Sequence, residues 1–238
     1  TLDGQTAGYA IVDTGANSTE AAVSAMEKAL AASGVVRNQI RRTVATGYGR
    51  VSIPFADKRV TEISCHAMGA SHLFPDTGVV IDIGGQDSKV IRVGEGGKVL
   101  DFAMNDKCAA GTGRFLEVMA NKLQVSLDAM GPLSLKASGE TVISSVCTVF
   151  AESEVVSLVA RNHPKEEIIR GLHRAIVSRV WSMVKTLGVK REVTMSGGVA
   201  KNQGVVAFLE DKLGHPIHVY KEPQIVGALG AALHAKGL

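Results

Sequence analysis

The chain has 238 residues, 45% of them hydrophobic, a formal net charge of +3, 26 glycines, six prolines and three cysteines. That length is enough for one large domain or two small ones with buried cores. A small positive charge from scattered basic residues argues against a nucleic-acid-binding surface. The apolar runs fall far short of the roughly 20 residues of a membrane span. The odd cysteine count argues against a disulfide framework and fits a reducing cytoplasm.

The first 75 residues predict alternating strands and helices. In chain order we expect a turn at 2–4, a strand over 8–15, a helix over 18–34, a short strand over 42–47 and a helix over 59–74. Ser18 or Thr19 can cap the first of these helices, and Gly34 can end it. Cys65 lies on the apolar second helix and is predicted to be a core residue; His66 beside it is predicted to pack or to face solvent.

The rest of the chain continues the alternation. We expect a buried strand over 79–85, a hairpin that pairs 88–93 with 98–104, helices opening after Cys108 and Cys147, a helix over 165–188, a strand over 192–198, a helix over 200–213, a strand over 216–220 and a helix over 227–235. Trp181, on the longest of these helices, is predicted to lie in the core. Strands mixed with helices throughout indicate an α/β class. A domain boundary is predicted near residues 75–78, with a return near 222–224.

The glycine pair in IDIGGQDSK, residues 81–89, lies between two predicted strands. It does not have the spacing of a Walker A loop. Two glycines nevertheless allow the backbone to approach a phosphate closely, and successive N–H groups can form an anion-binding nest. Asp82 and Asp87 flank the turn and could hold Mg²⁺ through water. The alternative interpretation of the pattern is an ordinary hairpin.

A second glycine pair, in TMSGGVAKN at residues 194–202, follows a predicted strand and opens a predicted helix. A helix N-terminus presents N–H groups that suit a phosphate or ribose. The segment GALGAA near the C-terminus is a third glycine-rich stretch. Each of the three is weak by itself, and together they favour a nucleotide site.

Several motifs together resemble a known family. DIGGQDSK and MSGGVAKN resemble the second phosphate loop and the adenosine loop of the acetate kinase/sugar kinase/Hsp70/actin superfamily. NDKCAAGTGRFLE (105–117), CTVFAESEV (147–155), ATGYGR and SCHAMGA are similar to those of the ATP-dependent activators of 2-hydroxyacyl-CoA dehydratases and of the related ATPase subunits of benzoyl-CoA reductase. The resemblance covers essentially the whole chain from about Gly4.

The resemblance implies two ribonuclease H-like domains around an ATP cleft. We expect the first domain to comprise residues 1–75 and the C-terminal helix 225–238, and the second to comprise 76–224. The family begins with a strand and a first phosphate loop, and this sequence starts at a point just after that loop. We expect residues to be missing upstream; the alternative is a real loss of part of the magnesium–phosphate machinery.

The resemblance also implies the residues that would bind each cofactor. ATP and Mg²⁺ would meet the phosphate-loop residues Gly84, Gly85 and Gln86, with Asp82, Gln86 and Glu152 as catalytic candidates. The adenosine side would be lined by Gly197, Gly198, Asn202, Gln224 and Gly227. One [4Fe-4S] cluster would be shared by a homodimer, with Cys108 and Cys147 as its ligands in each copy.

The physical chemistry of the two cysteines is compatible with that assignment. A [4Fe-4S] cluster needs four thiolates, and two from each of two symmetry-related chains would supply them. Each cysteine is predicted to precede a helix, whose N–H groups lower a thiol pKa and can donate to cluster sulfurs. The alternative for Cys108 and Cys147 is a buried structural role.

The acidic pair Glu152 and Glu154 follows Cys147. Residues two apart on a helix point to different sides, so the two carboxylates do not easily serve one site. A favourable interaction with the helix dipole is the simplest interpretation. The alternative is that they align the attacking water or couple nucleotide state to the cysteine-bearing helix.

The sequence therefore predicts an ATP-hydrolysing, one-electron donor. Reduced ferredoxin or flavodoxin would load it, and it would activate an acyl-CoA dehydratase or a benzoyl-CoA-type reductase. The alternatives are a small-molecule kinase of the same superfamily, a non-enzymatic actin-like interaction module, and one ATPase subunit of a heteromeric benzoyl-CoA reductase.

Overall fold

The computed structural model describes residue 1 and residues 5–144, 147–189 and 192–236. It contains two compact units. The first unit comprises residues 1–76, 93–100 and 224–238, and the second comprises 77–92 and 101–223. The predicted domain boundaries, at 76 and 225, lie close to those of the two units, but the prediction places residues 93–100 in the second domain. The domain assignment stays a prediction. No helix in the described ranges combines the length and apolar character needed to cross a membrane.

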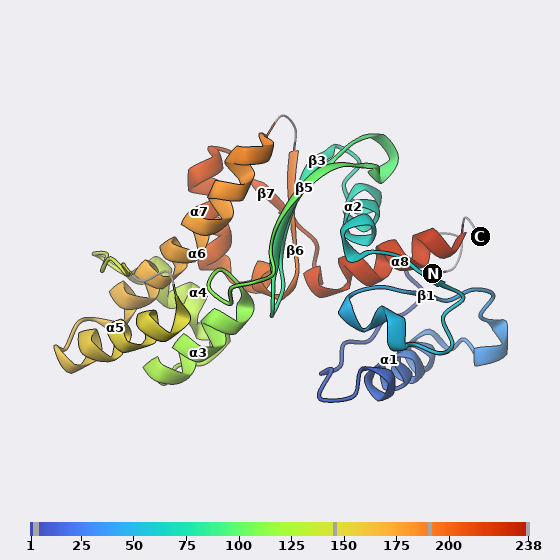
Figure 1. The fold of residues 1–238 in the computed structure, drawn as a ribbon, viewed down its shortest axis with the longest axis horizontal. Helices are drawn as coiled ribbons and strands as arrows, with labels where there is room; N and C mark the ends of the chain where they lie inside the picture. Colours follow the sequence, from blue (N-terminus) through green and yellow to red (C-terminus); the bar gives the residue numbers. More distant parts are fainter. Residues whose placement is uncertain (2–4, 145–146, 190–191, 237–238) are drawn as a thin grey trace. The chain divides into compact units, whose positions relative to one another are not determined.

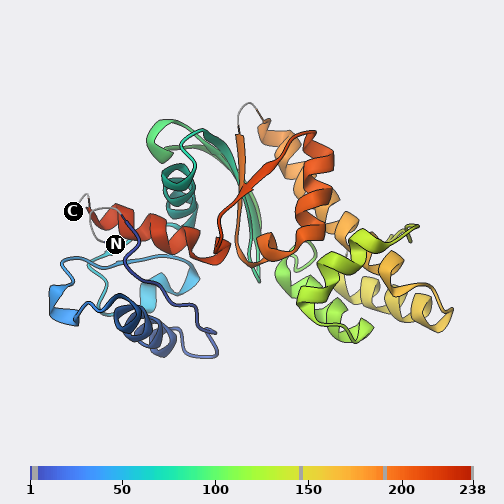
Figure 2. The same cartoon turned by 180° about the vertical axis from the view of Figure 1, so that it is seen from behind.

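Two helices form the core of the first unit. The elements of this unit are α1 (Ser18–Ser33), the short parallel strands β1 (Val44–Ala45) and β2 (Lys58–Arg59), α2 (Glu62–Leu73) and α8 (Val226–Lys236). Helices α2 and α8 pack closely because glycines lie between them: a Cβ at Gly69 would meet the carbonyl oxygen of Val226, and one at Gly230 would meet that of Cys65. Figures 1 and 2 show both helices side by side.

Two predictions about the N-terminal region were wrong. Residues 8–15 form no strand, because no strand within the described ranges pairs with them; Gly8 instead packs against α1. The turn predicted at 2–4 lies outside the described residues. The cap of α1 is Asn17, whose side chain accepts from the N–H groups of Thr19 and Glu20. Gly34 ends the helix in the left-handed conformation, as predicted.

A five-stranded sheet organises the second unit. Its strands are β3 (Thr77–Ile83), β4 (Ser88–Val93), β5 (Val99–Asn105), β6 (Glu192–Ser196) and β7 (Ile217–Val219), in the order β5-β4-β3-β6-β7. β3 pairs antiparallel with β4 and parallel with β6. All seven residues of β3 are buried, which explains why its sequence is an apolar run rather than an alternating one.

The helices of this unit are α3 (Gly113–Leu123), α4 (Leu127–Lys136), α5 (Thr148–Ala160), α6 (Lys165–Leu187) and α7 (Gln203–Leu213). α6 and α7 lie side by side against one face of the sheet in both views (Figures 1 and 2). The buried face of α6 joins strand residues such as Ile81 and Met195 in a single apolar cluster, and Trp181 packs partly buried against it.

Candidate functional site

Three polar side chains form a row across neighbouring strands of the second unit. Asp82 on β3 lies directly opposite Lys89 on β4 in the antiparallel register and opposite Ser196 on β6 in the parallel register. The Lys89 Nζ atom lies 3.3 Å from Asp82 Oδ2, and the Ser196 hydroxyl donates to Asp82 Oδ1 over 2.9 Å. All three residues are buried. Strand pairing therefore fixes both oxygens of the Asp82 carboxylate.

The turn after β3 carries the predicted phosphate-loop residues. The Gly84 N–H donates to the Asp87 carbonyl oxygen over 3.0 Å, which closes the turn. Lys89 Nζ also contacts Asp87 Oδ1 at 2.6 Å, so the lysine bridges both carboxylates. Gly85 and Gln86 are exposed, and a Cβ at Gly85 would meet only open space. The tip of this turn is therefore exposed to solvent, while the buried ion pairs of Lys89 hold the residues at its two ends.

The second glycine pair lies against the same strand. Gly197 has a positive φ of 84°, and a Cβ there would lie 2.9 Å from Asp82 Oδ1 and would meet the carbonyl oxygen of Ile83. Glycine is required on both counts. Gly198 is exposed and begins a 3-10 turn, Gly198–Lys201. The α-helix predicted over 200–213 therefore starts later, at Gln203.

Asn202 caps α7. Its Oδ1 atom accepts from the N–H groups of Gly204 and Val205, and its Nδ2 atom lies 3.2 Å from Nε2 of His173. His173 is completely buried, and burial lowers its pKa from 6.5 to about 4. A neutral imidazole therefore supports the cap below the second glycine pair.

The first turn of α3 is hydrogen-bonded to the phosphate-loop turn. The Gly113 N–H donates to the Gly84 carbonyl oxygen over 2.7 Å, and the Arg114 N–H donates to that of Gly85 over 3.0 Å. A Cβ at Gly113 would lie 3.1 Å from the Gly84 oxygen, so the approach depends on glycine. A displacement of the turn tip would therefore act directly on the N-terminus of α3.

Cys108 lies in the loop before α3, five residues ahead of Gly113. The helix predicted after Cys108 is α3, and the loop of residues 109–112 separates it from the cysteine. Gly111 in the loop has a positive φ of 92°, and a Cβ there would lie 2.8 Å from Cδ of Arg179. Asn105 Nδ2 donates to the carbonyl oxygens of Cys108 and Ala110 over 2.9 and 3.1 Å. Cys108 is half-buried in this hydrogen-bonded turn.

Cys147 has the position that the sequence predicts. It is the N-cap residue of α5, its side chain makes no capping hydrogen bond, and it is exposed. The N–H groups of the first helical turn lack intrahelical partners in any α-helix. Val149 and Phe150, the next large side chains, are 67% and 68% exposed. The thiol thus lies beside an apolar surface at a helix N-terminus.

The two acidic residues on α5 contact different partners. Glu152 forms an ion pair with Lys122 of α3 at 2.7 Å. Glu154 accepts from the N–H and hydroxyl of Ser144 at 3.1–3.3 Å. Glu152 therefore links the helix that follows Cys108 to the helix that follows Cys147, and Glu154 holds the segment before Cys147.

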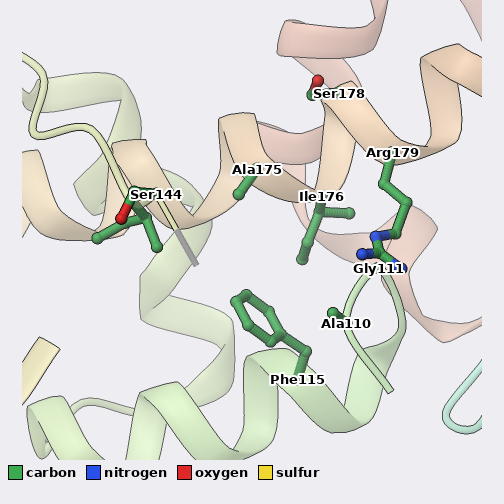
Figure 3. Close-up of a pocket in the computed structure, with 9 residues that line it drawn as sticks. Ala110, Gly111, Phe115, Ser144, Ala175, Ile176, Ser178 and Arg179 are labelled. Carbon is green, nitrogen blue, oxygen red and sulfur yellow. The ribbon is translucent and has the colours of Figure 1, made fainter. Parts of the chain in front are cut away.

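A cavity of about 210 Å³ lies behind the Cys108 loop. Figure 3 shows Phe115 and Ile176 projecting into it, with Arg179 reaching over the turn at Ala110 and Gly111. Ser144, near Cys147 in sequence, lies at its other side. The cavity is therefore bordered by the loop of Cys108, by the segment before Cys147 and by α6.

The remaining predicted site residues lie in the first unit. Gln224 is exposed. Gly227 is buried, and a Cβ at this position would meet the His66 ring. The structure does not bring these two residues together with the glycine pairs inside one unit. Cys65 is fully buried on α2, as predicted, and burial raises its pKa.

The sequence matches the BadF/BadG/BcrA/BcrD ATPase family over residues 3–235. The chain belongs to that family. A (R)-2-hydroxyglutaryl-CoA dehydratase activating ATPase from Acidaminococcus fermentans is 53% identical over 194 residues, which are 81% of this chain and 74% of the relative. A 2-hydroxyisocaproyl-CoA dehydratase activator from Clostridioides difficile is 48% identical over 210 residues, 88% of this chain and 79% of the relative.

Solved structures of such activators have the same fold. Component A of the (R)-2-hydroxyglutaryl-CoA dehydratase from Acidaminococcus fermentans superposes with a TM-score of 0.95 at 46% identity, covering 100% of this chain and 92% of that one. An activator of 2-hydroxyisocaproyl-CoA dehydratase from Clostridium difficile with bound ADPNP gives 0.87 at 47% identity, covering 91% and 81%. The ethanolamine utilization protein EutJ from Carboxydothermus hydrogenoformans, at 17% identity and a TM-score of 0.57, shares the fold alone. The predicted actin/Hsp70/sugar kinase fold class is confirmed.

The sequence prediction missed two of the three residues in the polar row, Lys89 and Ser196. A signal was present, because a hairpin whose turn is residues 84–87 places Asp82 opposite Lys89. Both glycine motifs also follow strands, and Ser196 ends the second one just as Asp82 lies near the end of the first. The register between β3 and β6, however, follows from no local pattern.

The donor set of this chain fits the cluster that the resemblance implies. Among the described residues, no group of three or more cysteine, histidine or acidic side chains is arranged to hold a metal ion within one chain. Cys65 is buried in the first unit, which leaves Cys108 and Cys147 as thiols of the second. Four thiolates would thus require two chains. Lys89 already contacts one carboxylate oxygen of Asp82 and one of Asp87. These carboxylates therefore suit contact with Mg²⁺ through water rather than direct coordination.

Proposed function

We propose that this chain is an ATP-hydrolysing activator that transfers single electrons to an acyl-CoA dehydratase, or to a reductase of the benzoyl-CoA type. The names of its relatives support the dehydratase as partner. A relative from Thauera aromatica that is named as one of the benzoyl-CoA reductase subunits is 32% identical over 206 residues. Reduced ferredoxin or flavodoxin would supply the electron. The protein would act as a homodimer.

The nucleotide would bind through both glycine motifs. The exposed tip at Gly85 and Gln86 would meet the phosphates, and Gln86 would orient the attacking water. Asp82 would hold Mg²⁺ through water. Gly197, Gly198 and Asn202, together with Gln224 and Gly227, would line the adenosine side. The ADPNP bound to a 47% identical activator supports an adenine nucleotide as the ligand.

Cys108 and Cys147 from each of two copies would hold one [4Fe-4S] cluster, which supplies one-electron transfer when bound. N–H groups at the start of α5 would donate toward the Cys147 side and favour added negative charge. The exposed apolar side chains of Val149 and Phe150 support burial of this surface against a second copy, because large exposed apolar groups cluster at interfaces.

The observation that carries the proposal is the pair of hydrogen bonds from Gly113 and Arg114 to Gly84 and Gly85. The turn proposed to meet the phosphates and the helix that follows Cys108 share these bonds within one compact unit. The ion pair between Lys122 and Glu152 extends the connection to the helix that follows Cys147. We assign Glu152 to this coupling rather than to alignment of the attacking water.

The test is the iron and acid-labile sulfide content of anaerobically purified protein. We expect four irons per dimer of the wild type, and loss of the cluster in Cys108→Ser and in Cys147→Ser. Cys65→Ala is the matched control, since Cys65 is buried in the first unit; it should keep the full iron content. A Cys108 or Cys147 variant that retains full iron overturns the ligand assignment.

ATP hydrolysis is tested separately. The wild type should hydrolyse ATP, and with its partner should transfer electrons only while it does so. A small-molecule kinase would instead transfer phosphate to a sugar or acid and would need neither thiol. Unchanged phosphate transfer in the double cysteine variant would therefore favour the kinase over the electron donor.

A further inference from the structure

Lys89 is a lysine buried between two carboxylates, and we infer that it acts as a tethered cation that holds the phosphate-loop turn in its nucleotide-binding shape. Its Nζ atom lies 2.6 Å from Asp87 Oδ1 and 3.3 Å from Asp82 Oδ2. The inference rests on the proposed nucleotide-binding function of this turn and deepens it, because it assigns the charge that orders the turn to the protein itself.

Burial makes this arrangement different from a surface ion pair. The side chains of Lys89, Asp82 and Asp87 are 3%, 4% and 7% exposed. Buried carboxylates without a positive partner are strongly destabilising, because water no longer solvates them. The two carboxylates lie on either side of the turn tip. Asp82 belongs to β3, before the turn, and Asp87 directly precedes β4, after it. A single ammonium that contacts both therefore fixes the width of the turn.

Strand pairing holds the ammonium in place. Lys89 lies directly opposite Asp82 in the β3–β4 register, and Lys89 as a whole, backbone included, is 2% exposed. Ser196 donates to the other oxygen of Asp82, and the N–H of Gly84 donates to the backbone of Asp87. The lysine thus fills the space in which a free cation could contact both carboxylates. Mg²⁺ that accompanies a nucleotide would approach from the exposed side, at Gly85 and Gln86.

The first experiment measures binding of Mg·ADPNP by calorimetry. Lys89→Met keeps the length of the side chain and removes its charge. We expect its Kd to rise at least about tenfold, equivalent to about 1.4 kcal/mol. Lys136→Met, at an exposed lysine of the same unit, is the matched control and should bind as the wild type does. Equal Kd values for Lys89→Met and the control overturn the inference.

The second experiment replaces the tethered cation by a free one. Lys89→Ala removes the ammonium together with its chain, and methylammonium should restore Mg·ADPNP affinity in a saturable manner. Tetramethylammonium has the same charge but no N–H donors, so it should not restore binding. Equal effects of the two ions would show a general salt response and would contradict the inference.

The third experiment needs no nucleotide. If Lys89 balances charge, Lys89→Met/Asp87→Asn should unfold at a higher urea concentration than Lys89→Met, because one uncompensated carboxylate is removed. Should Lys89→Met fail to fold, a folded double variant gives the same support. A double variant no more stable than Lys89→Met, or one that does not fold although Asp87→Asn alone does, overturns the inference.

The outcomes separate the two proposals. A wild type that binds no adenine nucleotide contradicts the proposed function, and the urea comparison still tests the tethered cation. A wild type that binds nucleotide, together with a Lys89→Met variant of equal affinity and stability, contradicts only the role of Lys89.

Discussion

The two compact units are stabilised by different means. In the first, α2 and α8 come so close that backbone meets backbone, and Gly69 and Gly230 make this possible. In the second, a sheet and long helices bury large side chains around a polar row at Asp82 and Lys89. The first unit is therefore sensitive to added volume, and the second to changes in charge.

This difference matters for the proposed activity. The charged row, both glycine turns and both cysteine segments belong to the second unit, where hydrogen bonds and ion pairs connect them. Gln224 and Gly227, which the proposed function assigns to the nucleotide, belong to the first unit. Substitutions should therefore separate by unit according to their physical type: added volume should disturb the first unit most, and changed charge the second.

The largest effect should come from a single methyl group between α2 and α8. Gly230→Ala places a Cβ against the carbonyl oxygen of Cys65, and neither backbone can move independently of its helix. We expect a loss of about 3 kcal/mol in the free energy of unfolding, at the upper end of overpacking effects. Hydrogen exchange of the α2 amides should accelerate. Ala228→Ser, at an exposed position of α8, is the control and should change little.

The second unit should respond to acid through His173. Its pKa is about 4 in the folded chain and 6.5 unfolded, because burial penalises the charged ring. The unfolded state therefore binds a proton first as the pH falls. The stabilisation is complete above pH 6.5, decreases between 6.5 and 4, and is constant below. From pH 7.5 to 5 we expect a loss of about 2 kcal/mol from this group.

Urea unfolding at several pH values measures this loss. His173→Gln does not titrate, so its stability should change less between pH 7.5 and 5 than that of the wild type, although it starts lower. Identical pH dependence in both proteins would mean that the imidazole is protonated or solvated in the folded state.

An intermediate effect is expected at the Cys108 loop. Asn105→Ala removes two hydrogen bonds from one amide to the carbonyl oxygens of Cys108 and Ala110. We expect a loss of about 1 to 2 kcal/mol and faster hydrogen exchange confined to residues 108–112. Asn121→Ala, exposed on α3, serves as the control. Slow exchange in this loop of the Asn105 variant would show that Gly111 and the backbone suffice to hold the turn.

The smallest effect should be that of the ion pair between Lys122 and Glu152. Its side chains are 45% and 33% exposed, so solvent and salt screen the attraction. A double-mutant cycle with Lys122→Ala and Glu152→Gln should give a coupling energy of about 0.5 kcal/mol that disappears at high salt. A coupling above about 2 kcal/mol would place this pair with the buried charges instead.

Local patterns were sufficient for elements whose signals agree. Helix α6, predicted over 165–188 and found over Lys165–Leu187, has an apolar face of matching period along its whole length. The strands on both sides of the first glycine pair and the position of Cys147 before a helix followed similarly. The assignment of site residues to ATP, Mg²⁺ and the cluster stays a prediction.

Other features depend on partners distant in sequence. The strand predicted over 8–15 has suitable residues, but the part of the chain that the structure describes offers it no partner strand. Helix α4 was not predicted because Gly131 and Pro132 lie inside it. Ser126 caps it, and a Cβ at position 131 would lie 3.1 Å from Oδ1 of Asn202, so the glycine serves packing. The conformation of the loop before α3 could not be predicted, because Gly111 adopts a left-handed conformation against Arg179, a distant residue.

The exposure of Cys147 at the start of α5 has a consequence for assembly. Under the proposed function each chain contributes half of a coordination sphere, so acquisition of iron and association of subunits are one equilibrium. Loading should then be second order in protein, and dilution of the loaded dimer should release metal. Dilute protein would remain monomeric and colourless, which gives the cell a concentration threshold below which no electron donor forms.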